Sequence, residues 1–334
     1  MRKKISAVVQ YLVFLGIGIF LTWWQFSKMT DVERVQFRES LLHANYIVIL
    51  PIAVVAILSH ISRAMRWKIM IEPMGYYPST SNTFYSVMCG YFANTFLPRA
   101  GEILRCTLLS RYEKIPVNKL IGTILIERVF DLFCYFLIII FTIAVQLDTV
   151  REFVKKSIRN ITHKNLNFPY WELVVGIIIV SALVFIIGRW ILKKYGNHRH
   201  IIKLKGIHIG LKEGFLSIIR LKKRRAFILH SIFIWSMYLL EIYIGFSALK
   251  ATSGLGIAAG LSVLSLATLA MIVAPGGIGA FPVAIQQVLL IYSIDNISFG
   301  WLIWGTTTAL TIVIGLISFG LLIYTNRNKN ETKQ

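Results

Sequence analysis

The stretch of sequence that decides the fold is a polar break inside an apolar run, and it reads NTFLPRAGEILR over residues 94–105. Pro98 removes a backbone donor and disfavours helix just before it, while Gly101 relaxes the turn. As helices, the arm at residues 83–97 would reach about 22 Å and the arm at residues 101–111 about 16 Å. Neither arm can cross a hydrocarbon core of about 30 Å, so the sequence predicts a re-entrant helical hairpin.

The rest of the chain is apolar enough to need a bilayer as its solvent. Of the 334 residues, 56% are hydrophobic and 15% are charged, and the mean hydropathy is +0.67. A soluble chain would carry roughly a quarter charged residues. Six runs are long enough to cross the hydrocarbon as helices. They cover residues 5–24, 46–61, 117–147, 173–192, 227–248 and 299–325. The second run is the shortest, and an extension to Trp67 is its alternative end.

A second interrupted stretch covers residues 254–294 and breaks at PGGIG, residues 275–279. Its return arm, residues 281–294, would be about 21 Å long as a helix, which again is too short to cross. The incoming arm could nearly span. We therefore expect a second hairpin here, with a helix that spans as the alternative.

The predicted elements fall into two halves of opposite orientation. Residues 1–168 read span, span, hairpin, span, and residues 169–334 repeat this order from the other side. We therefore expect an all-α polytopic membrane protein with one integral membrane domain, residues 1–334. In such an inverted-topology repeat, the two hairpin tips approach the bilayer midplane from opposite sides.

The formal net charge of +21 comes from Lys and Arg residues that flank the apolar runs. Their excess on one side predicts a multi-pass protein of the cell (inner) membrane with both termini in the cytoplasm. The basic residues after the second run, Arg63, Arg66 and Lys68, count toward that side. Because the basic residues are spaced by membrane topology, we expect no nucleic-acid partner.

Cysteine and histidine spacing indicates no metal site. Cys89, Cys106 and Cys134 lie within or beside apolar runs and match neither a zinc motif nor a disulfide framework. The seven histidines form no pair four residues apart on one span. We expect no metal and no cofactor.

The first hairpin offers a site for an anionic group. The arm after the break begins with free N–H groups at the tip, and a helix N-terminus attracts anions. Arg99 and Arg105 add guanidinium groups suited to phosphate oxygens. An ordinary loop in water is the alternative. The candidate binding residues here are Asn94, Pro98, Arg99, Gly101, Glu102 and Arg105.

The third apolar run contains the buried acidic candidates Glu127 and Asp131, with Arg128 between them. They should lie roughly 8 to 15 Å deep in the hydrocarbon, where unpaired charges cost at least a few kcal/mol each. Glu127 and Asp131 share one helix face, and Arg128 is within reach of Asp131. The surplus negative charge predicts Arg99 or Arg105 as a partner. A static ion-pair network that clamps the hairpin is the alternative to substrate binding.

The second break exposes backbone that a head group could approach closely. Three of the four residues 276–279 are glycines, and no side chain there is charged. A simple helix kink is the alternative reading. The candidate binding residues are Pro275, Gly276, Gly277 and Gly279.

Taken together, residues 94–105, Glu127-Arg128 with Asp131, and PGGIG at residues 275–279 resemble one known family. It is the flippase-like transmembrane region of lysylphosphatidylglycerol synthases, and the resemblance covers most of the chain. The resemblance implies lipid translocation, with the polar hairpin and the acidic third span near the substrate path. Many members place a glutamate shortly after the second glycine motif, where this chain has Phe281-Pro282-Val283. Bifunctional members carry a soluble synthase domain after the membrane region, whereas we expect a stand-alone member here.

We therefore expect a flippase or transporter rather than an enzyme. Its cargo would be an anionic or aminoacylated phospholipid, or a polyprenyl-phosphate-linked lipid. One alternative is an intramembrane enzyme of lipid-linked sugar or aminoacyl-lipid synthesis, and another is a non-catalytic scaffold subunit. A separate synthase or envelope-biogenesis protein is an expected partner.

Overall fold

The computed structural model describes residues 16, 18–97, 100–147 and 221–331. All regular secondary structure among these residues is helical, which confirms the predicted all-α class. Most of the first predicted span and all of the fourth, residues 173–192, lie outside the described residues; residues 18 to 28 are helical. The α-helices that follow are α2 (Asp31–Leu42), α3 (Ile49–Ile71), α4 (Thr80–Phe96), α5 (Ala100–Glu113), α6 (Val117–Val145), α10 (Arg224–Phe246), α11 (Ile257–Val273), α12 (Ala280–Ile291) and α13 (Ser298–Glu331).

Four helical segments of the described chain are long and apolar enough to cross a membrane. They match four of the six predicted runs. The second run takes its longer alternative and continues beyond it, because one continuous helical segment covers Tyr46–Met74 and so passes both residue 61 and Trp67. The side chain of Trp67 is fully buried in this extension, so packing holds the added turns. The other three segments are Val117–Val145, Arg224–Phe246 and Ser298–Arg327.

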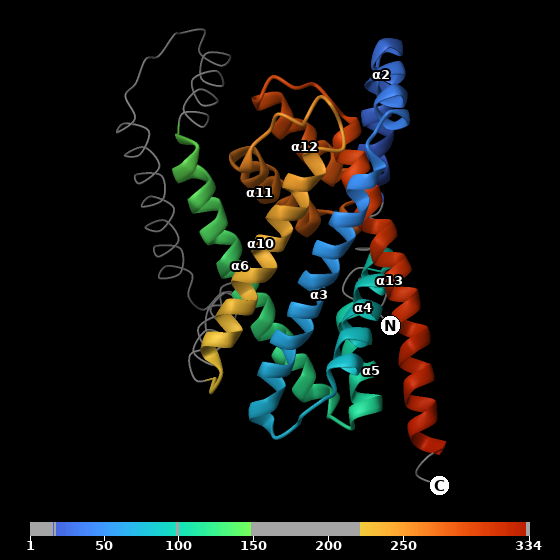
Figure 1. Ribbon diagram of the computed structural model, residues 1–334, viewed down its shortest axis with the longest axis vertical. Coiled ribbons are helices and arrows are strands. Elements are labelled where there is room, and N and C mark those ends of the chain that lie inside the picture. Colours follow the sequence, from blue (N-terminus) through green and yellow to red (C-terminus); the bar gives the residue numbers. More distant parts are fainter. Residues whose placement is uncertain (1–15, 17, 98–99, 148–220, 332–334) are drawn as a thin grey trace, which may run out of the picture.

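Both interrupted stretches fold as helical hairpins. Helix α4 packs against α5, and α11 packs against α12. These arms have 17, 14, 17 and 12 residues, so the longest reaches only about 26 Å. Figure 1 shows the α4–α5 hairpin in the lower half of the molecule and the α11–α12 hairpin in the upper half. Entry of both hairpins into a membrane from opposite sides stays a prediction.

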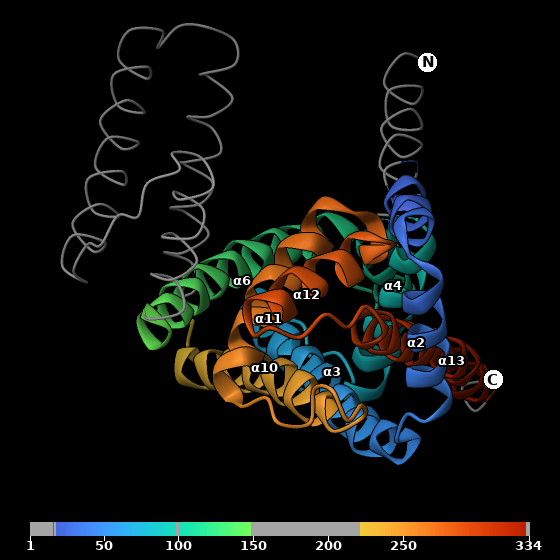
Figure 2. The same cartoon turned by 90° about the horizontal axis from the view of Figure 1, so that it is seen from above.

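The helix contacts of the two halves correspond to one another. Helices α3 and α10 lie side by side and run in opposite directions, as Figures 1 and 2 show. Helix α4 packs on α13, and its counterpart α11 packs on α6. Helix α5 likewise contacts α6, as α12 contacts α13. An inverted repeat predicts this pairing, although the expected boundary between the halves at residue 168 lies outside the described residues.

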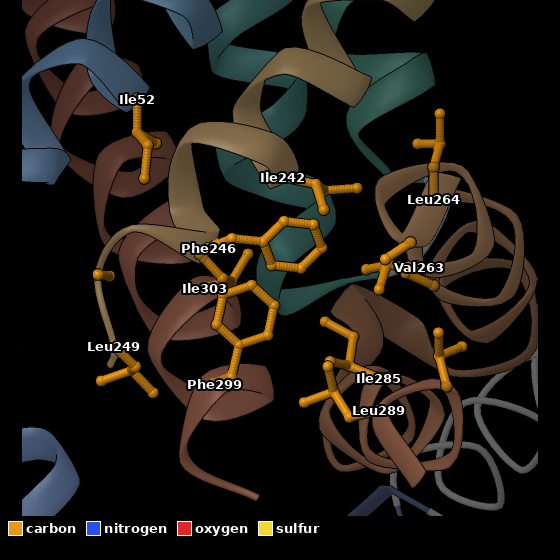
Figure 3. Packing of buried hydrophobic residues seen from close by; sticks show 14 of the residues in the cluster. Ile52, Ile242, Phe246, Leu249, Val263, Leu264, Ile285, Leu289, Phe299 and Ile303 are labelled. Carbon is orange, nitrogen blue, oxygen red and sulfur yellow. The ribbon is translucent and has the colours of Figure 1, made fainter. Parts of the chain in front are cut away.

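A hydrophobic cluster fixes the second hairpin to the spanning helices. Figure 3 shows Phe246 of α10 beside Phe299 of α13, with Ile285 and Leu289 of α12 close by. The ring centroids of Phe246 and Phe299 are 5.2 Å apart. Val263 of α11 is also fully buried here. Because five helices share this cluster, with Ile52 contributed by α3, the hairpin is held by packing on both of its arms.

The two arms of the first hairpin meet through glycines. A Cβ on Gly101 would overlap the carbonyl oxygen of Gly90, and a Cβ on Gly90 would lie 2.8 Å from the carbonyl oxygen of Gly101. The backbones of α4 and α5 therefore touch without side chains between them. Only glycine fits both positions, since neither contact has a flexible side chain that could move aside.

We expect Gly101→Ala to destabilise the protein by about 1–3 kcal/mol, because the added methyl group must push α4 and α5 apart. Gly122→Ala is the matched control, since no atom lies within 4 Å of a Cβ built on Gly122 of α6. The control should be neutral or slightly stabilising. Unfolding of each variant by a denaturing detergent measures the difference. Equal stability of the two variants would contradict the close helix contact.

Candidate buried ion cluster

Five charged side chains meet between helices α3, α5 and α6. The Arg63 Nη1 atom is 2.9 Å from both Glu127 Oε1 and Asp131 Oδ2. Arg66 is 2.8 Å from Glu127 Oε1 and 2.7 Å from Asp131 Oδ1. Arg105 Nη2 lies 2.8 Å from Glu127 Oε2. We call these five residues the ion cluster.

The ion cluster is almost completely sealed by protein. Glu127 and Arg66 are 0% exposed. Aromatic rings cover the guanidinium groups, with Arg66 over Phe227 at 5.5 Å and Arg105 over Trp67 at 4.8 Å. Burying charges in this way costs several kcal/mol per ion, which is recovered only through close and multiple pairing. The cluster therefore depends on all three helices keeping their places.

Helical spacing brings each set of charges to one face. Arg63 and Arg66 are three residues apart on α3, and Glu127 and Asp131 are four apart on α6, so each pair projects side by side. The predicted pairing of the acidic residues with Arg105 is confirmed. The hydroxyl groups of Tyr238 and Ser231 on α10 accept from Arg63 and Arg66 at 3.0 Å, which ties α10 to the cluster.

Sequence reasoning missed Arg63 and Arg66 as members of the site. The sequence predicts them on the cytoplasmic flank, because the charge count takes residues 46–61 as the second span and not its alternative end at Trp67. The structure places both inside α3, which continues to Ile71. The apolar pattern that extends to Trp67 was the available signal, since two arginines three residues apart on a longer helix would share one buried face.

The charge balance of the cluster is the reverse of the expected one. The surplus was predicted to be negative, but three arginines now face two carboxylates, so the described cluster carries a surplus of one positive charge. Arg128 contacts Glu102 of α5 at 2.7 Å rather than Asp131. The Arg128 side chain is 45% exposed, so this pair lies at the edge of the buried site and adds no net charge.

At the first hairpin tip, Asn94 caps the return arm. Its Oδ1 atom accepts a hydrogen bond from the backbone N–H of Gly101 at 2.9 Å. One of the predicted free donors of α5 is therefore satisfied by a side chain of α4. Pro98 and Arg99 lie outside the described residues.

At the second hairpin tip, the glycines are required by the backbone. Gly276, Gly277 and Gly279 have φ values of +61°, +70° and +68°, a region that disfavours residues with a Cβ. The indole N–H of Trp304 donates to the Gly276 carbonyl at 2.7 Å and fixes the turn. The turn is therefore more than a helix kink.

The two hairpin tips lie next to each other. The 3₁₀ turn Pro275–Gly277 packs against α4, and a Cβ built on Gly276 would lie 3.4 Å from the carbonyl oxygen of Thr95. The structure thus brings the end of α4 at the first tip together with the glycine turn of the second tip. Among the described residues, no group of three or more His, Cys, Asp and Glu side chains is placed to hold a metal ion.

The family model for the transmembrane region of lysylphosphatidylglycerol synthases matches residues 8–317. The chain belongs to this family. The match agrees with the family resemblance that the two hairpin motifs and the acidic third span indicated.

A curated relative is a UPF0104 membrane protein of Methanocaldococcus jannaschii, which is 28% identical over 148 residues. The aligned part covers 43% of this chain and 42% of that relative, so the chain spans less than half the length of the curated relative it matches. No solved structure matches the chain.

The residues that follow the second glycine motif have a packing role in this chain. Phe281, which follows the second glycine motif, packs against the hydrophobic cluster of Figure 3. Pro282 contacts Gly300 of α13 so closely that a Cβ on Gly300 would lie 2.8 Å from the Pro282 Cα. Phe281 and Pro282 therefore serve helix packing at this position.

We expect Glu127→Gln to destabilise the protein by about 3–5 kcal/mol, because it leaves three buried guanidinium groups with a single carboxylate. Glu102→Gln is the matched control, since it breaks the partly exposed pair with Arg128 and should cost less than about 1 kcal/mol. The free energy of unfolding in mixed detergent micelles measures both. A Glu127 variant as stable as the Glu102 variant would show that the cluster does not hold the helices together.

Proposed function

We propose that this protein moves a lipid with an anionic head group between the two leaflets of a membrane. The cargo class is an anionic or aminoacylated phospholipid, or a polyprenyl-phosphate-linked lipid. The surplus positive charge of the ion cluster carries this proposal. A buried site with one unbalanced guanidinium group is completed electrostatically by one phosphate group.

The geometry of the hairpin tips supports the same assignment. Helix α5 begins at the tip, and its dipole is positive at that end. Arg105 lies one and a half turns further along and belongs to the ion cluster, while Arg99 stands in the sequence directly before α5. The glycine backbone at Gly276 lies beside this end. A phosphate at the tips would therefore meet backbone donors and guanidinium groups together, while its acyl chains remain in lipid.

The basic residues at the ends of the helices indicate which end of the protein faces the cytoplasm. Helices α3, α5 and α13 end, and α6 and α10 begin, at the lower end of Figure 1. This end carries Lys68, Arg111, Lys119, Arg224 and Arg327. The opposite end of the described chain has fewer Lys and Arg residues, so the positive-inside rule supports a cytoplasmic lower end in an inner membrane.

A scaffold role is the second candidate, because both carboxylates of the ion cluster already have arginine partners. A fully internal network of this kind can be purely structural. In a scaffold for a separate synthase, neutralising one cluster residue would leave function intact as long as the helices stay packed. An enzyme of lipid-linked sugar or aminoacyl-lipid synthesis would instead form a new lipid product.

Purified protein in vesicles should exchange fluorescently labelled phosphatidylglycerol between leaflets faster than empty vesicles do. We expect Arg99→Ala to lower the exchange rate about tenfold, the effect of losing one charge-assisted hydrogen bond to the phosphate. Asp131→Asn should also lower the rate, because it removes the carboxylate that holds Arg63 and Arg66 in position. Quenching of the outer-leaflet label by a membrane-impermeant reductant measures the rate.

Arg111→Ala is the control, because it also removes an arginine from the hairpin but at the exposed end of α5. Its exchange rate should equal that of the unmodified protein. Unchanged rates in both Arg99→Ala and Asp131→Asn would exclude these residues from the site, and no exchange by the unmodified protein with any labelled lipid of the proposed class would reject transport.

A further inference from the structure

A buried polar triad joins three helices at the lower end of the molecule in Figure 1. Asn82 of α4 donates to Glu113 Oε1 of α5 at 2.7 Å. Asn82 and Asn326 of α13 exchange two amide hydrogen bonds, at 2.9 and 3.1 Å. The two amides are 3% and 7% exposed, so these bonds are shielded from solvent. We call Asn82, Glu113 and Asn326 the lower triad.

A second triad joins the corresponding helices at the opposite end. The Gln146 Oε1 atom at the end of α6 accepts from Ser262 of α11 at 2.9 Å and from the hydroxyl of Tyr292 at the end of α12. The Gln146 amide also donates to the Ala258 carbonyl at 2.6 Å. Gln146 is 6% exposed. We call Gln146, Ser262 and Tyr292 the upper triad.

The two triads occupy equivalent places in the two halves. Each triad links the C-terminal end of a membrane-long helix, the start of a hairpin's first arm and the end of its second arm. The central residue differs, because Asn82 of the first arm bonds both partners in the lower triad, whereas Gln146 of the long helix bonds both in the upper triad. The long helix always belongs to the other half of the chain, since α13 bonds the first hairpin and α6 bonds the second. Each triad therefore ties one hairpin to the opposite half at one end of the molecule.

Hydrogen bonds suit a contact that must form and break. A pair of buried amides gains little net free energy over the same groups in water, so water entering that end can replace the bonds at low cost. Apolar packing at the same place would oppose opening. Each triad lies at the base of a hairpin and the hairpin tips meet between the two bases, so each triad lies on its own side of the tips.

We propose that the lower and upper triads are two gates that open in turn, each giving access to the hairpin tips from its own side. This inference rests on the proposed transport function and assigns its conformational control. Opening of one triad releases the base of one hairpin from the opposite half while the base of the other hairpin stays bound, which is the kind of movement that alternating access requires.

Side-specific thiol labelling tests the gates without any lipid assay. A variant with Cys89, Cys106 and Cys134 replaced by alanine carries one new cysteine, Thr95→Cys, at the first hairpin tip. In vesicles, a membrane-impermeant maleimide is applied to one face at a time. Arg111→Cys and Lys250→Cys, at exposed positions near the two ends, identify the faces.

Conservative substitutions weaken the hydrogen bonds of each gate while keeping the size of the side chains. Glu113→Gln removes the charge that Asn82 bonds in the lower triad, and Tyr292→Phe removes only the hydroxyl of the upper triad. Asn326→Ala and Gln146→Ala are the stronger versions. We expect the lower variants to raise tip labelling about fivefold from the Arg111 face, and the upper variants to raise it equally from the Lys250 face.

Labelling that rises from the same face in both sets, or that stays unchanged in correctly folded Glu113→Gln and Tyr292→Phe proteins, would overturn the gates. Thr252→Ala is the control, because Thr252 is fully buried and bonds only backbone carbonyls outside the triads. It should leave labelling unchanged from both faces. If the two sets of variants raise tip labelling from opposite faces but the protein exchanges no lipid, the gates are supported and the lipid cargo is rejected. If lipid exchange is normal and tip labelling does not change in either set, only the gates are rejected.

Discussion

The structure depends on the pairing of two carboxylates that lie inside a membrane-long helix. Glu127 and Asp131 sit where an unpaired charge would cost several kcal/mol, so arginines must reach them. Those arginines come from α3 and from the return arm of the first hairpin. The need to pair the charges therefore fixes how α3, α5 and α6 are arranged, and it also produces the positive surplus at the site.

Close backbone contact is the second constraint, and glycines meet it. Gly90 and Gly101 let the arms of the first hairpin touch, while positive φ angles at Gly276, Gly277 and Gly279 form the tip of the second. A side chain at these positions would separate the tips or strain the turn. The two tips can lie together because Gly276 has no side chain between its backbone and the carbonyl oxygen of Thr95.

The pairing of contacts between the halves links the fold to the proposed transport. Each hairpin packs on a long helix of the other half, and a polar triad holds it at one end. The ion cluster lies away from both triads and joins α3, α5 and α6 with α10. A lipid carrier needs such a division, in which one part binds the head group while separate contacts control access from each side.

The sequence by itself determined the helical class, the breaks at residues 98–101 and 275–279, and the importance of Glu127 and Asp131, because hydropathy, proline and glycine act locally. It also predicted Arg105 as a partner. Tertiary structure alone decided that Arg63 and Arg66 complete the ion cluster, that Arg128 turns to Glu102, and that distant amides form the triads. These outcomes depend on which helices become neighbours, and residues far apart in the chain carry no local signal of the partner they will meet.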